Sequence, residues 1–74
     1  MPELPHVSGR KAIKIFESLG FEIVRQKGSH VILRKGNKGC VVPIHKELAV
    51  GTLRSAIKQS GIDIEEFIDA YKNR

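Results

Sequence analysis

The chain has 74 residues, of which 41% are apolar, a composition that excludes a disordered chain and allows one small domain over residues 1–74. Thirteen Lys and Arg against eight Asp and Glu give a net charge of +5, which favours a polyanionic partner such as nucleic acid. One cysteine excludes an intrachain disulfide, and neither a membrane span nor a signal-peptide pattern is present, so we expect a cytoplasmic protein with no membrane contact.

A first helix is predicted after Ser8, a residue type that accepts hydrogen bonds at helix N-termini. Gly20 follows the last apolar position and ends the pattern. The apolar stripe at helical spacing consists of Ala12, Ile13, Phe16 and Leu19. We therefore expect this helix to pack its stripe against a sheet and to turn its lysines to solvent.

A first strand is predicted over residues 21–26, where residues that favour strands are concentrated. The adjacent Ile23 and Val24 leave undecided which side of the strand faces the core, unless a bulge intervenes. The turn Lys27-Gly28-Ser29 follows and leads directly into a second strand.

The second strand has side chains that alternate between its two sides. Val31 and Leu33 share one side, and His30, Ile32 and Arg34 share the other. If Val31 and Leu33 lie in the core, His30 faces outward. Ile32 is then an apolar spot on the outer face, of the kind that often marks a partner contact.

The remaining elements are a third strand and two helices. Residues 35–39 are rich in Gly and Asn and predict a hairpin into a strand at 40–43. Apolar spacing predicts a second helix that opens at Gly51-Thr52 and ends at Gly61. A short terminal helix begins after Asp63, which has Glu66 three positions later in a capping-box pattern.

This order of elements predicts an α+β fold with three antiparallel strands. The helices most simply cover one face of the sheet, and the other face is left for a partner. Residues 63–74 form a C-terminal helical extension of the single domain.

His30 is the candidate for chemistry, because histidine moves protons near neutral pH. Lys27 and Ser29 precede it across Gly28, which lets the backbone approach a ligand closely. The structural alternative is a surface histidine that caps its own turn. No pattern around Ser29 supplies an orienting carboxylate, so we expect this serine to hold a phosphate oxygen or to shape the turn.

Basic residues surround His30 in the sequence. Arg25, Lys27 and Arg34 are candidate phosphate contacts, and the alternative is a solvated basic edge. Arg54 and Lys58 lie four apart on one helix surface and form a second candidate contact. The His, Cys and acidic residues are spread over separate elements, so we expect neither a metal nor another cofactor.

With these residues assembled, the chain resembles the HicA family of bacterial toxins, the messenger-RNA interferases of HicA/HicB toxin–antitoxin systems. The resemblance covers nearly the whole chain. It rests on Val7-Ser8-Gly9, Gly20-Phe21, Arg25-Gln26-Lys27-Gly28-Ser29-His30, Val42-Pro43 with His45, and Gly51-Thr52-Leu53-Arg54.

The resemblance implies a fold like that of double-stranded-RNA-binding domains, and an endoribonuclease of a type II toxin–antitoxin system centred on His30. It adds His45 to the candidate RNA contacts. It also implies a HicB-like antitoxin that covers the His30 face, which fits an outward Ile32. The helix from Asp63 resembles a variable extension, to which no family function transfers.

A metal-independent mechanism would use the 2′-hydroxyl of RNA as nucleophile, with His30 as general acid or base. The sequence leaves open whether His45, water or a second chain moves the other proton. A non-catalytic RNA-binding module of the same fold is the main alternative. A DNA-binding regulator is a weaker one, since no recognition-helix pattern is present.

Overall fold

The computed structural model describes residues 4–73, so residues 1–3 and 74 of the predicted domain lie outside the described part. The elements in chain order are α1 (Gly9–Ser18), β1 (Glu22–Lys27), β2 (His30–Lys35), β3 (Lys38–Pro43), α2 (Val50–Ser60) and α3 (Ile64–Lys72). The strands form one antiparallel sheet in the order β1-β2-β3. The predicted α+β order of elements is confirmed.

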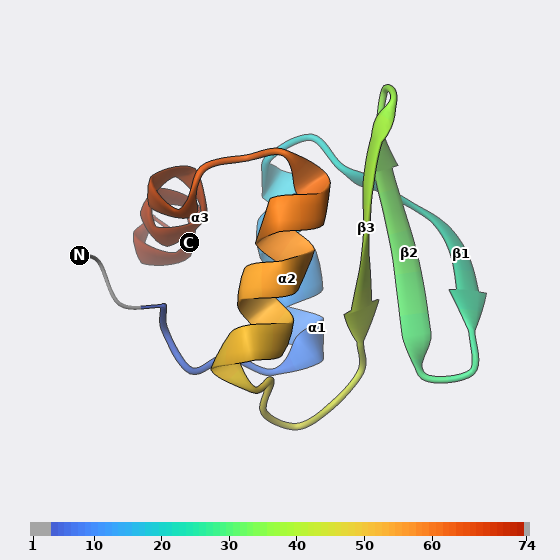
Figure 1. Ribbon diagram of the computed structural model, residues 1–74, viewed down its shortest axis with the longest axis horizontal. Helices are drawn as coiled ribbons and strands as arrows, with labels where there is room; N and C mark the ends of the chain where they lie inside the picture. The colour runs from blue at the N-terminus through green and yellow to red at the C-terminus, as the bar shows by residue number, and fades with distance from the viewer. Residues whose placement is uncertain (1–3, 74) are drawn as a thin grey trace.

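The sheet has one side toward the helices, with β3 nearest to them and β1 farthest away (Figure 1). Val31 and Leu33 of β2 pair with Val42 and Cys40 of β3, and all four side chains are at most 2% exposed. The predicted inward side of β2 is therefore confirmed, and we call this side of the sheet the covered face. The opposite side, which carries His30, is the open face.

The helix α1 buries a wider arc than the predicted stripe. Leu19 is only half-buried, whereas Ile15, which lies outside the stripe, is fully buried. The helix α1 packs against β1, β3 and α3. Phe67 of α3 is fully buried, and its ring centroid lies 5.4 Å from that of Phe16. The terminal helix thus completes the hydrophobic core.

The capping hydrogen bonds predicted at the starts of α1 and α3 are confirmed. Ser8 Oγ accepts a hydrogen bond from the backbone N–H of Lys11 at 3.0 Å. Asp63 and Glu66 form a capping box, in which the backbone N–H of Asp63 donates to Glu66 Oε1 at 3.2 Å. The helix α2 starts at Val50, one residue before the predicted position.

None of the helices in residues 4–73 combines the length and apolar character needed to cross a membrane.

The strand β1 is an exposed edge with a bulge. It begins at Glu22, so Phe21, which was predicted to lie in the strand, precedes it and is buried. Ile23 pairs with Leu33 on the covered side, but Arg25 already pairs with Ile32, which leaves Val24 as the extra residue of the bulge. The bulge explains why two adjacent apolar residues occur in this strand.

The segment before α1 is joined to the loop after β3. The backbone N–H of Gly9 donates to the carbonyl oxygen of His45 at 2.8 Å, and that of Leu48 donates to Val7 at 2.8 Å. A side chain at position 9 would overlap the carbonyl oxygen of Pro43. Glycine is therefore required at position 9 for the two segments to approach this closely.

Candidate functional site

The turn that precedes His30 is held on both sides. Gly28 and Ser29 are its two residues, and Gly28 has φ +61°, in the left-handed region that favours glycine. Gln26 Nε2 donates to the carbonyl oxygen of Gly28 at 3.1 Å. The carbonyl oxygen of Ser29 accepts from the backbone N–H of Ile44 at 2.6 Å. These contacts fix the backbone at His30, the first residue of β2.

The open face carries His30 and the three cations predicted for it. Directly paired residues of antiparallel strands project their side chains to the same face. Lys27 pairs with His30, and Arg25 pairs with Ile32. Arg34 follows Ile32 on the same face of β2. The three cations and His30 are all exposed. The predicted outward direction of His30 is therefore confirmed.

The exposed apolar group on this face differs from the prediction. Ile32 is half-buried, whereas Val41, its partner on β3, is 38% exposed. The central strand of a sheet has neighbours on both sides that cover its residues, but β3 is an edge of this sheet. An apolar contact with a partner would therefore involve Val41 more than Ile32.

An open hollow of about 360 Å³ lies between His30 and α2. The strand β3 contributes Val41 and Pro43. The residues contributed by α2 are small or uncharged, and they are Gly51, Thr52, Ser55, Ala56 and Gln59. Their spacing of three and four places them on one face of the helix. They were not predicted as site residues, because small and uncharged residues at helical spacing are common on helix surfaces.

Gln59 ties α2 to the edge of the sheet. The backbone N–H of Val41 donates to Gln59 Oε1 at 3.2 Å, and Gln59 Nε2 donates to Ser55 Oγ at 3.5 Å. The start of α2 borders the same hollow. Its N-cap residue, Ala49, supplies no side-chain hydrogen bond, and its first turn has no acidic residue. The positive end of the helix dipole is therefore not neutralised by the helix itself.

His45 lies apart from this hollow. It borders a different one at the start of α1, together with Ser8, Arg10, Ile44 and Lys46. The structure therefore does not bring the side chain of His45 to the hollow that His30 lines. The backbone of His45 has a role of its own, since its carbonyl oxygen accepts the hydrogen bond from Gly9.

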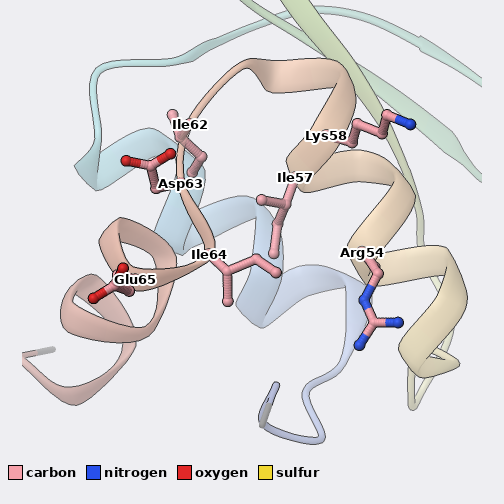
Figure 2. A pocket seen from close by; sticks show the side chains of 7 residues that line it. All are labelled: Arg54, Ile57, Lys58, Ile62, Asp63, Ile64 and Glu65. Atoms are coloured by element: carbon pink, nitrogen blue, oxygen red, sulfur yellow. The ribbon is translucent and has the colours of Figure 1, made fainter. Parts of the chain in front are cut away.

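Arg54 and Lys58 also lie away from His30. They border a groove of about 550 Å³ between α2 and α3. Figure 2 shows the apolar side chains of this groove between the two helices and Lys58 directed away from α3. The other residues that line the groove are Ile57, Ile62, Asp63, Ile64 and Glu65. The two cations and the His30 hollow are thus on different sides of α2.

Cys40 lies on the covered face and is 2% exposed. Burial raises the pKa of its thiol to about 11, because a thiolate would lose its hydration there. The thiol therefore stays protonated at neutral pH and is not a nucleophile. Within residues 4–73, no three His, Cys, Asp or Glu side chains gather in a way that could hold a metal ion.

The sequence profile of a family described as the HicA toxin of bacterial toxin–antitoxin systems matches residues 9–62. This range begins with α1 and ends just before α3. A search among curated proteins finds no relative that matches the chain.

Proposed function

Because the chain belongs to the HicA family of toxins from bacterial toxin–antitoxin systems, we propose that it acts in the cytoplasm as an endoribonuclease on messenger RNA. Family membership makes it a toxin that has an antitoxin partner. The observation that supports the activity is the position of His30. This imidazole is exposed at the start of β2, beside a hollow and among cations on the open face.

The proposed reaction uses the 2′-hydroxyl of the RNA as nucleophile. Its oxygen forms a bond to the adjacent phosphorus while the bond from phosphorus to the 5′-oxygen breaks, which leaves a cyclic phosphate on one product. One proton leaves the 2′-hydroxyl and one reaches the 5′-oxygen. A neutral His30 takes the first proton, or a protonated His30 gives the second.

The second proton carrier is water in this proposal. Among the described residues that line the hollow, His30 alone has a side chain of a type that commonly serves as a general acid or base. His45 borders a different hollow. Solvent reaches the His30 hollow directly, because His30 and most of the α2 side chains around it are exposed.

The cations of the open face would bind the substrate and stabilise charge on the phosphate. Lys27, Arg25 and Arg34 share the face of His30 and attract phosphate oxygens. The exposed backbone of Gly28 and the hydroxyl of Ser29 lie next to His30 in the chain and would contact the same phosphate. We assign Arg54, Lys58 and His45 to more distant phosphates of the RNA, because they lie outside the hollow.

We also propose that the antitoxin is a HicB-like protein that covers the open face. A protein that covers His30 would exclude RNA from the hollow. The exposed Val41 and the half-buried Ile32 offer apolar contact there, and the three cations offer attraction to an acidic surface.

The test is RNA cleavage by the purified protein and by His30→Ala, with a chelator present. We expect the substitution to lower the cleavage rate by roughly 10²–10⁴-fold, the usual contribution of a general acid or base. RNA affinity should change little, because the cations remain. The matched control is His6→Ala, which removes another exposed histidine, paired with Glu47 at 3.6 Å, and should cut at the normal rate.

Three outcomes would contradict parts of this proposal. Equal cleavage by the protein and His30→Ala would remove His30 from the chemistry. Cleavage of a substrate that lacks every 2′-hydroxyl would remove the nucleophile. RNA binding without any cleavage would instead support a non-catalytic RNA-binding module of the same fold.

A further inference from the structure

We propose that the hollow between His30 and α2 binds the base of one unpaired nucleotide, and that Gln59 and Ser55 donate hydrogen bonds to it. This inference rests on the proposed cleavage of RNA and adds the residues that select where the RNA is cut. It assigns a role to a face of α2 that the sequence did not single out.

The hydrogen bonds of Gln59 fix the orientation of its side-chain amide. A backbone N–H can only donate, so the 3.2 Å contact with Val41 requires the oxygen of the Gln59 amide at that position. The amide nitrogen must then lie at the other end of the group. One of its two hydrogens is directed at Ser55 Oγ, 3.5 Å away, which leaves the other for a ligand.

Ser55 is a donor for the same reason. Its oxygen accepts the hydrogen bond from Gln59, so its own hydrogen can be donated into the hollow. Thr52 adds a second hydroxyl one helical turn earlier. The wall formed by α2 is therefore rich in donors and uncharged, which suits the carbonyl oxygens and ring nitrogens of a base.

The shape of the hollow fits one base and not a duplex. A volume of about 360 Å³ is at the small end for ligand pockets, which span roughly 300–1,000 Å³. Val41 on β3, which is 38% exposed, offers an apolar surface for the face of a base. Bases within a duplex are stacked and paired, whereas an unpaired base can be turned into such a hollow.

The strand whose cations would contact the phosphates is different from the elements that would hold the base. The cations Arg25 and Lys27 lie on β1, His30 lies on β2, and the hollow extends from His30 along β3 to α2. A nucleotide whose base occupies the hollow would extend its phosphate back toward His30 and Lys27. The substrate class is therefore single-stranded RNA, read at the nucleotide next to the cut.

The deciding substitution is Gln59→Glu. Glutamate keeps an oxygen for the N–H of Val41 but has no N–H to donate, so it preserves the structural contact and removes the proposed one. On an RNA library with every base around the cut, we expect cleavage at the preferred sites to fall about three- to tenfold, the range for one neutral hydrogen bond. Cleavage at the other sites should change less, so the distribution of cuts shifts. Ser55→Ala should shift it in the same direction.

The control for charge is Asn37→Asp. It makes the same change in net charge in the turn between β2 and β3, at the end of β2 opposite to His30. We expect this variant to keep the wild-type distribution of cuts. The library is also annealed to its complement, and the duplex form should be protected from cleavage.

A binding measurement separates this inference from the cleavage proposal. His30→Ala protein, with and without Gln59→Glu, is titrated with short single-stranded RNAs of each base. Loss of base preference in the Gln59→Glu protein supports the inference, whether or not the wild type cuts RNA. Unchanged base preference, or an unchanged distribution of cuts, overturns it. Absence of cleavage by the wild type would overturn only the proposed function.

Discussion

The two faces of the sheet are built from alternate residues of the same strands, but they carry different kinds of side chain. On the covered face, Val31 and Leu33 are at most 2% exposed and pack in the core. On the open face, His30 and Arg34 are exposed. Strand alternation therefore separates the residues that stabilise this fold from those available to bind a substrate.

This separation has an energetic basis. Burying a leucine or valine side chain contributes about 1.5–3 kcal/mol to folding, whereas an exposed side chain contributes little. The covered face therefore tolerates few changes, and the open face can carry charge without a cost in stability. Substitutions at neighbouring positions of one strand should have effects of different kinds.

The largest effect is expected for Leu33→Ala on the covered face. Leu33 is fully buried, so the substitution should lower the free energy of unfolding by about 2–5 kcal/mol. Its neighbour Ile32 is half-buried on the open face, and Ile32→Ala should cost less than about 1.5 kcal/mol. Urea denaturation of both variants measures the difference, and equal losses would show that the two faces contribute equally to stability.

The next effect concerns Cys40 and alkaline pH. Burial raises the folded pKa of Cys40 to about 11, above the ordinary value of 9.0 for a thiol. The stabilisation from a neutral thiol is therefore fully present below about pH 9 and is lost as the pH rises toward 11. The loss should reach roughly 2–3 kcal/mol at the upper end.

Urea denaturation between pH 7 and 11 measures this loss, with Cys40→Ala as the control. Other groups also titrate in this range, so the relevant quantity is the difference between the two proteins. The wild type should lose more stability than Cys40→Ala as the pH rises. Parallel curves would show that burial on the covered face does not raise the pKa of the thiol.

The smallest effect is expected for the cations. Replacing Arg25 and Lys27 with Gln removes charge from the open face, and we expect the salt dependence of RNA binding to fall by about 0.7 per lost phosphate contact. Replacing Arg54 and Lys58 removes the same charge from the other side of α2. We expect a smaller change there, because Asp63 and Glu65 border the same groove.

Affinity for single-stranded RNA at several salt concentrations measures both double variants. Their equal net charge makes each the control of the other. A larger change for the Arg54 and Lys58 pair would place the main RNA path along α2 and away from the open face.

Much of the fold could be predicted because its signals are local. Ser8 and Asp63 start helices by hydrogen bonds within their own first turns. The alternation in β2 separates Leu33 from His30 without any knowledge of the rest of the chain. The burial of Ile15 was not predicted, because it depends on how elements distant in the sequence pack against α1.

Part of the candidate site also depends on local signals, and part depends on how distant elements pack. Lys27 and His30 are near each other in space because a two-residue turn joins their strands. Which face of α2 lies against β3 depends on how the helix docks, and no local pattern gives this. Lys58 and Gln59 are adjacent in sequence but about 100° apart around the helix, so one borders the groove and the other the hollow.

The backbone hydrogen bonds between residues 7–9 and residues 45–48 have a consequence for the order of folding. They join parts of the chain separated by about half its length, and contacts of this kind close late because loop-closure entropy opposes them. The hollow needs α2, which follows this loop. The site is therefore completed late in folding, and a chain whose synthesis stops before α2 would contain His30 but not the hollow. Incomplete synthesis of this toxin should yield inactive fragments.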